Sequence, residues 1–174
     1  MRHRLLTIVA LATALTAWSA GTASAFMTTT TTLDLTPGTV PLATGTIVTN
    51  QFVNSYGLRF IGGAPPQGAA NYIQDNSLWN LNKLKFTWRP VRQVALSFRD
   101  QNRNQETHTL TAYNRDGVQV GSASYTDKGV VGDNFTLRIT TSYRKSQAIS
   151  YVVESNVPPA AELLTRVSYV HRTL

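Results

Sequence analysis

Aromatic, amide and carboxylate side chains gather in one irregular segment, residues 62–82, and their chemistry suits a sugar. Two flat aromatic rings there can pack against the C–H face of a sugar ring, while the polar groups beside them can hydrogen-bond its hydroxyls. The candidate ligand site comprises Asn71, Tyr72, Asp75, Asn76 and Trp79. The alternative interpretation is that the two rings only cover an open end of the hydrophobic core.

The two histidines beyond the N-terminal segment, His108 and His171, do not fit a catalytic pattern. His108 is in phase with Leu110 and Ala112, which is typical of an edge or core residue whose ring is satisfied. No serine carries the glycine pattern of a nucleophile elbow. Several acids stand where aspartate is favoured for turn geometry alone: Asp75, Asp100, Asp116, Asp127 and Asp133. We therefore expect no catalytic residues and no enzymatic activity.

Calcium is the one cofactor that the sequence leaves open. Calcium takes six to eight oxygen ligands, and four residues could supply some of them if the ends of the fold converge: Asp34, Asn50, Asn54 and Asp75. No D-x-D-x-D-G loop is present, so turn and capping roles are favoured and no cofactor is expected. The chain has no cysteine, which excludes thiol catalysis, disulfides and cysteine-ligated metals.

The elements that must position these residues are strands, because apolar residues recur at every second position. Such alternation places the apolar members on one face of a half-buried strand. Four runs follow this pattern: Leu84, Phe86 and Trp88; Val94, Leu96 and Phe98; Phe135, Leu137 and Ile139; and Ile149, Tyr151 and Val153. Since no long amphipathic helix interrupts them, the sequence predicts an all-β protein.

Turn signals divide the strands. Asn114-Arg115-Asp116-Gly117 predicts a hairpin, since an Asp-Gly pair tolerates positive φ. With turns about every ten residues, we expect an antiparallel, jelly-roll-like β-sandwich of about nine or ten strands. Only Pro158–Leu164 is typical of a helical turn. The polar tract Thr28–Thr32 is expected to be a frayed start, and Asn50–Gly57 a compact turn that plugs one end of the sandwich.

Residues 1–25 are typical of a secretory signal. Arg2 and Arg4 precede an apolar run, and Ala23-Ser24-Ala25 provides an A-x-A cleavage site. The apolar run is shorter than the roughly 20 residues that cross a bilayer, and no second run follows. We expect a secreted, extracellular chain with one β-sandwich domain at residues 26–174 and no membrane span after cleavage; an uncleaved anchor is the alternative.

The charge is moderately basic. Of 16 basic residues, two lie in the signal with none of the nine acids, so the net charge falls from +7 to +5 on cleavage. The cations are scattered singly, which does not fit a nucleic-acid-binding arm. They include Arg59, Lys83, Lys85, Arg99, Arg115 and Arg138. A basic exterior still attracts acidic polymers at low salt.

Two blocks of the sequence resemble a known family. "GTIVTNQFVNSYGLRF" is similar to a G-T-x-V-x-N-Q-Y-x-x-x-G-V-x-F segment, and "VRQVALSFRD" with "HTLTAYNRDGVQVGSASY" to the core strand and hairpin that follow it. The family comprises secreted bacterial β-sandwich domains, some carrying PEP-CTERM sorting tails. The resemblance covers about Leu33 to Tyr125 and implies an exported galactose-binding-like or carbohydrate-binding-module-like jelly roll, usually of unassigned role.

Two departures from that family bear on function. Leu164-Thr165-Arg166-Val167 stands where relatives carry Ile-Asp-Asn, which removes an acidic calcium ligand, and the sorting tail is missing, which favours free secretion. Two functions remain. One is a non-catalytic module that binds carbohydrate or cell-surface glycan through end loops. The other is a structural or interaction protein of the cell envelope, whose basic sheet face binds another protein or an anionic polymer. Neither the ligand nor the oligomeric state follows from the sequence.

Overall fold

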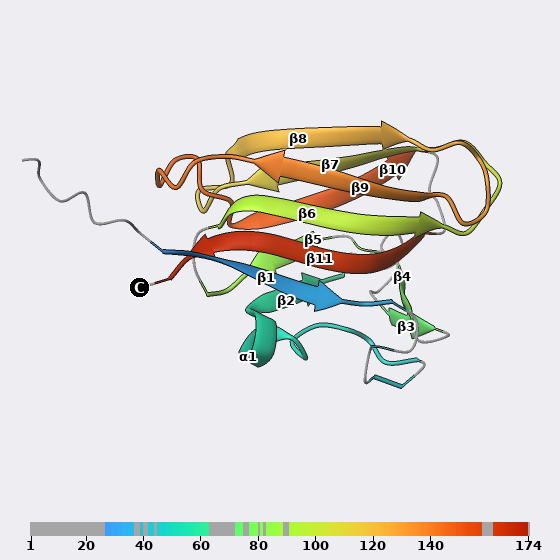
Figure 1. Ribbon diagram of the computed structural model, residues 1–174, viewed down its shortest axis with the longest axis horizontal. Helices are drawn as coiled ribbons and strands as arrows, with labels where there is room; N and C mark the ends of the chain where they lie inside the picture. Colours follow the sequence, from blue (N-terminus) through green and yellow to red (C-terminus); the bar gives the residue numbers. More distant parts are fainter. Residues whose placement is uncertain are drawn as a thin grey trace, which may run out of the picture.

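The computed structural model describes residues 27–36, 39, 42–43, 45–62, 72–74, 77–79, 81, 83–88, 91–157 and 162–173. These residues form two antiparallel sheets that enclose one core (Figure 1), which confirms the predicted all-β sandwich. They contain eleven strands rather than nine or ten. Within the same ranges, no helix has the length and apolar character needed to span a bilayer.

One sheet has six strands and the other has five. The six-stranded sheet follows the order β3 (Tyr72–Gln74), β4 (Ser77–Trp79), β11 (Glu162–Arg172), β6 (Val91–Asp100) and β9 (Asn134–Thr140), with β1 (Thr28–Asp34) also paired to β11. The five-stranded sheet follows the order β2 (Leu58–Ile61), β5 (Lys83–Phe86), β10 (Tyr151–Val157), β7 (Thr107–Tyr113) and β8 (Gln119–Thr126). Consecutive strands from β8 to β11 alternate between the sheets, as in a jelly roll.

The period-two pattern explains which side chains enclose the core. In β9 the residues alternate between exposed and buried along the whole strand, and its inward members are Phe135, Leu137 and Ile139. Val94, Leu96 and Phe98 of β6 are buried as predicted. The hairpin between β7 and β8 also forms where expected, and Gly117 takes a φ of 79° within it.

Two predicted strand faces are correct only in part: Leu84, Phe86 and Ile149 are buried as predicted, but other members are not. In β10 the buried residues are Val152 and Glu154, while Tyr151 and Val153 are only partly buried. The prediction failed because two adjacent valines fit either phase and a glutamate was not expected to point inward. Trp88 is 45% exposed although Leu84 and Phe86 are buried, because β5 ends at Phe86 and the chain turns before the indole.

Two segments form strands although the sequence predicted other structures for them. Thr28–Thr32 pairs with β11 along β1, in a register that places Thr28 opposite Arg172, instead of fraying. Glu162–Leu164, part of the expected helical turn, begins β11, and its pairing with β6 shifts between Leu164 and Arg166. Threonine favours extended backbone, and the long β11 offers backbone hydrogen-bond partners along its length. Strand pairing therefore determines the conformation of both segments.

The turn at residues 50–57 has the expected architectural role. It contains a short helix, α1 (Val53–Tyr56), and the buried Phe52 contacts the rings of Tyr56 and Phe60 edge-on. Gly57 ends the helix with a φ of 63°. Only glycine adopts this left-handed backbone without strain, so the prediction for Gly57 is confirmed.

Candidate functional site

The predicted sugar site falls largely outside the residues that the structure describes. Asn71, Asp75 and Asn76 lie outside them, as do the side chains of Tyr72 and Trp79. The backbones of Tyr72 and Trp79 are described, and they stand opposite each other where β3 pairs with β4. The proposed sugar contact through these five residues therefore stays a prediction.

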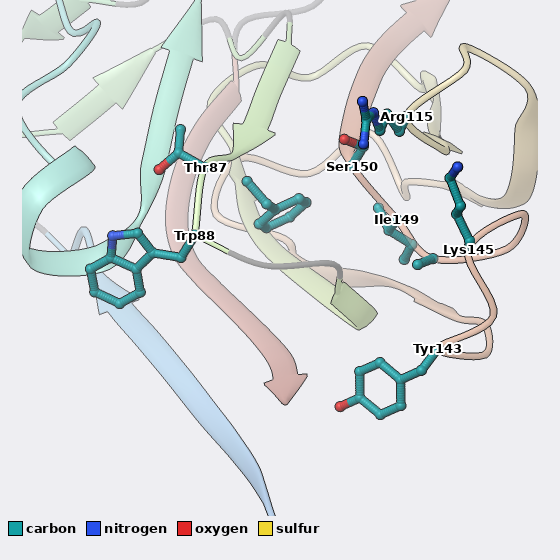
Figure 2. A pocket seen from close by; sticks show the side chains of 9 residues that line it. Thr87, Trp88, Arg115, Tyr143, Lys145, Ile149 and Ser150 are labelled. Carbon is teal, nitrogen blue, oxygen red and sulfur yellow. The ribbon is translucent and has the colours of Figure 1, made fainter. Parts of the chain in front are cut away.

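A pocket of about 480 Å³ opens at another part of the sandwich (Figure 2). Three segments meet there: the end of β5 and the residues after it, the β7–β8 hairpin, and the loop before β10. The lining residues are Phe86, Thr87, Trp88, Arg115, Tyr143, Lys145, Ala148, Ile149 and Ser150. They include two cations and no carboxylate, and the floor is formed by buried apolar side chains such as Ile149.

Trp88 is held at the pocket by close contact with the backbone of Gly57. The backbone N–H of Thr87 donates to the carbonyl of Gly57 over 2.8 Å, which fixes the chain just before the indole. A Cβ on Gly57 would lie only 2.5 Å from Cδ2 of Trp88. The indole also contacts the ring of His171 edge-on, with centroids 6.4 Å apart.

Gly57→Ala should therefore disturb both the fold and the pocket. The left-handed backbone alone costs about 1–2 kcal/mol for a residue with a Cβ, and the indole of Trp88 must also move. Gly45→Ala is the matched control, because Gly45 has a φ of 87° and a Cβ added to it would meet nothing within 4 Å. Chemical denaturation should show the larger loss for Gly57→Ala, with a change in Trp88 fluorescence; equal losses would contradict the close contact.

The two cations are presented by loops that are tied together. Arg115 lies in the β7–β8 hairpin, where the Asn114 carboxamide oxygen accepts from the backbone N–H groups of Asp116 and Val118, each over 2.9 Å. The same amide donates through Nδ2 to the carbonyl of Ser146, also over 2.9 Å, and so links the hairpin to the loop that carries Lys145. The buried Asn114 thus connects the two loops that carry the cations.

Tyr143 adds an aromatic ring with more positive charge around it. The guanidinium carbon of Arg172 lies 4.5 Å from the centroid of this ring, and that of Arg92 lies 5.5 Å away. The Tyr143 hydroxyl is buried and makes no hydrogen bond with any described residue. Aromatic surface and cations therefore converge at one opening of the sandwich.

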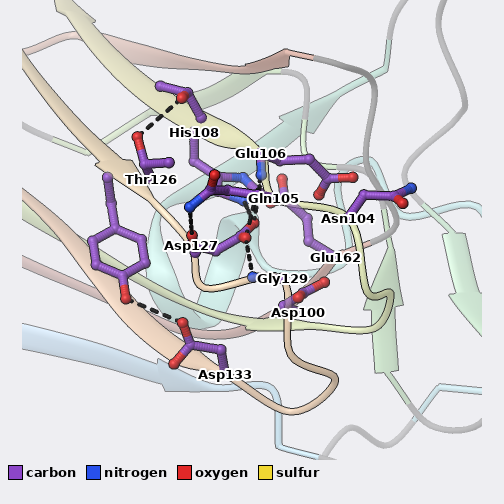
Figure 3. Close-up of polar contacts among 12 residues, drawn as sticks. Asp100, Asn104, Gln105, Glu106, His108, Thr126, Asp127, Gly129, Asp133 and Glu162 are labelled. Carbon is purple, nitrogen blue, oxygen red and sulfur yellow. Dashed lines mark hydrogen bonds and ion pairs between the residues drawn. The ribbon is translucent and has the colours of Figure 1, made fainter.

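A separate cluster of ionisable groups is buried between the two sheets (Figure 3). Its centre is His108 of β7, which is 0% exposed, and five of the nine acids of the chain are buried around it. These acids are Asp100, Glu106, Asp127, Glu154 and Glu162. His108 and Glu154 come from the five-stranded sheet and Glu162 from the six-stranded one, so the cluster joins the sheets.

Asp127 fixes the orientation of the His108 ring. Nε2 of His108 lies 3.0 Å from Oδ2 of Asp127, and the same carboxylate accepts from the backbone N–H groups of Glu106 and Gly129. Nδ1 faces two glutamates instead, at 2.6 Å from Oε2 of Glu162 and 3.8 Å from Oε1 of Glu154. The ring of Phe135 packs against the imidazole, with centroids 4.5 Å apart.

The surroundings shift the acid–base behaviour of the cluster. Burial disfavours charge on His108, but its contacts with Glu154, Glu162 and Asp127 outweigh burial and raise its pKa to about 10. Burial raises the pKa of Glu154 to about 8, with His108 acting against this and Glu162 adding to it. Burial also opposes ionisation of Asp127, yet hydrogen bonds from Gly129 and His108 lower its pKa.

Comparisons with known proteins add only a fold likeness. No family model matches the chain, and no curated protein matches it. One solved structure with some likeness is the carbohydrate-binding module CBM6cm-2 of Cellvibrio mixtus lichenase 5A, in complex with cellotriose. It is 10% identical over 68% of this chain and 88% of that chain, with a TM-score of 0.31. Neither family membership nor function follows from this likeness.

The sequence interpretation missed both of these sites. Trp88 was assigned to the core, and no signal in the sequence brings the hairpin cation Arg115 to it. The calcium candidate Asp34 accepts hydrogen bonds from Thr36 and pairs with Arg166 at 3.7 Å, while Asn50 and Asn54 are exposed and Asp75 lies outside the described residues. Only His108 gave a usable signal, because its phase with Leu110 placed it inside.

Proposed function

We propose that this protein is a secreted, non-catalytic module that binds an anionic carbohydrate polymer in the pocket between Trp88 and Tyr143. The observation that carries the proposal is a 45% exposed indole that lines one pocket together with Arg115 and Lys145, with no carboxylate among the described lining residues. Its volume of about 480 Å³ falls within the range of ordinary small-molecule sites, about 300–1,000 Å³. It has room for one or two sugar rings of a longer chain.

Each part of the pocket has a role in this binding. The apolar face of a sugar ring packs on the indole of Trp88, which is exposed enough to receive it. A carboxylate or sulfate on the sugar pairs with Arg115, whose planar guanidinium can donate two parallel hydrogen bonds, and with Lys145 as a point charge. A neutral sugar can make only the contact with the indole of Trp88, so the pocket favours charged polymers.

A non-catalytic role fits the positions of the two described imidazoles. Nε2 of His108 is bonded to Asp127 between the sheets, and Nε2 of His171 lies 3.1 Å from the hydroxyl of Thr31. Neither residue lines the pocket. The predicted contact through Asn71, Tyr72, Asp75, Asn76 and Trp79 remains a second candidate glycan surface, which is tested separately by Trp79→Ala.

Trp88→Ala should weaken binding of an anionic polysaccharide such as polygalacturonate by at least about tenfold, because the stacking surface is lost. Affinity electrophoresis and calorimetry with the soluble polymer measure this directly.

The double change Arg115→Ala with Lys145→Ala should weaken binding and flatten its dependence on salt, since fewer charge pairs remain to be screened. A neutral β-glucan of similar length should bind more weakly to the unchanged protein.

Arg138→Ala is the matched control, because Arg138 is exposed on the outer face of the six-stranded sheet and away from the pocket lining. It should leave the affinity unchanged. If Arg138→Ala and the pocket variants weaken binding equally, the basic sheet face is the binding surface and the envelope-interaction alternative holds. Absence of binding to both charged and neutral polymers would overturn the proposal.

A further inference from the structure

Six buried polar atoms of the cluster around His108 hydrogen-bond to no described residue, and four of the six belong to just three residues. These four are Nδ1 of His108, Oε1 of Glu154, and both Oε1 and Oε2 of Glu162. Nδ1 and Oε2 of Glu162 lie close together, at 2.6 Å, without the alignment of a hydrogen bond. Buried polar atoms are nearly always paired, because leaving one unpaired costs free energy. One atom from each of the three residues lies within 4.8 Å of the others, which indicates that a shared partner belongs there.

The hydrogen bond at Nε2 of His108 leaves Nδ1 available to bind the shared partner. Asp127 is held by backbone N–H groups and has only acceptor atoms when ionised, so Nε2 of His108 carries the hydrogen that it accepts. A bound metal ion would displace the second ring proton from Nδ1, so that the lone pair of Nδ1 is directed at the two glutamates. A carboxylate that accepts from the remote nitrogen is the usual support of a metal-binding histidine.

We propose that His108, Glu154 and Glu162 form a buried structural site for a divalent cation of the zinc class. Zinc binds imidazole nitrogen and carboxylate oxygen at about 2.0–2.2 Å, which places neighbouring ligands about 3.3 Å apart in a tetrahedron. The distances from Nδ1 to Glu162 and Glu154, 2.6 and 3.8 Å, bracket this value. Small side-chain movements therefore suffice to accept the ion.

The choice of atoms and of metal follows from the remaining contacts. Glu106, His108 and Asp127 form another close group, but its ring nitrogen and the Asp127 carboxylate are already engaged in hydrogen bonds. Calcium prefers a shell of oxygens, whereas an imidazole nitrogen with carboxylates suits zinc and its neighbours. Both oxygens of Glu162 are unpartnered, so either of them is available to bind the ion.

Charge and topology give the ion a structural role. Among the described residues, no lysine or arginine pairs with the five buried acids, and His108 is the one basic group in contact with them. A dication offsets part of this negative charge. Because His108 and Glu154 belong to one sheet and Glu162 to the other, the ion would tie the two layers together.

The test is to unfold the protein in guanidinium with EDTA, remove both, and refold it with or without Zn²⁺ or Co²⁺. We expect one ion per chain by mass spectrometry, visible absorption bands typical of tetrahedral Co²⁺, and a midpoint of thermal unfolding several degrees higher with Zn²⁺. A refolded protein that binds neither ion would overturn the proposal. Binding of Ca²⁺ alone would overturn the assignment to the zinc class.

Variants locate the ion. Glu162→Gln keeps the shape of a ligand but weakens its donation, and should lower zinc affinity at least a hundredfold with the far-ultraviolet spectrum unchanged. Asp127→Asn should lower it about 10–100-fold, because the ring loses its orienting carboxylate. The control Asp133→Asn alters a carboxylate that contacts Tyr125 and Lys128 outside the cluster, and should bind zinc as the unchanged protein does. Equal affinity in all four proteins would place the ion elsewhere.

Discussion

Asp127→Ala is expected to lower the free energy of unfolding by about 3–5 kcal/mol, because removing one partner of a buried ion pair leaves the other charge buried and unpaired. The Asp127 side chain is 0% exposed, as is almost all of His108. Its carboxylate accepts from the Glu106 and Gly129 backbones as well as from the ring. Alanine leaves these three donors without that acceptor in an environment that water does not reach.

Urea denaturation in the presence of EDTA measures this loss without any contribution from a bound cation. Asp133→Ala is the comparison, since among the described residues the Asp133 carboxylate accepts a hydrogen bond from Tyr125 alone, at 3.1 Å, and pairs with Lys128 at 3.8 Å. We expect its loss to be about 1 kcal/mol. Similar losses in the two variants would show that the cluster does not depend on Asp127.

The sandwich itself was predictable because its information is local. Leu96, Phe98, Phe135 and Leu137 alternate with polar residues, and a strand with one buried face must keep that alternation. The Asp-Gly turn marks the hairpin for an equally local reason, since its backbone angle is set by the glycine. Fold class therefore followed from neighbouring residues alone.

The two sites were not predictable because they depend on contacts between distant segments. Glu162 was assigned to a helical turn, and nothing nearby shows that it pairs with Asp100 of β6. Glu154 lies in a strand whose valines fit either face, and an acid is a poor indicator of the inner one. Trp88 fits the apolar alternation after Phe86, so only the end of β5 reveals that it is exposed.

The buried cluster also depends on the core that supports it. The ring of Phe135 packs against His108 and also stacks with Tyr125 and Phe98, at centroid distances of 4.9 and 5.3 Å. These aromatic contacts come from β8, β9 and β6, and so from both sheets. A change in this stack should reach the imidazole through Phe135 because close-packed interiors transmit displacement.

Phe98→Ala is therefore expected to cost about 3–5 kcal/mol, since Phe98 is 0% exposed and its removal leaves a cavity under Phe135. Val118→Ala, at a valine that is 58% exposed, should change stability by no more than about 0.5 kcal/mol. Because Phe135 joins Phe98 to His108, the double variant with Asp127→Ala should lose less than the two single losses together. Strict additivity in urea denaturation would mean that core and cluster are independent, and that the imidazole is held by its carboxylates alone.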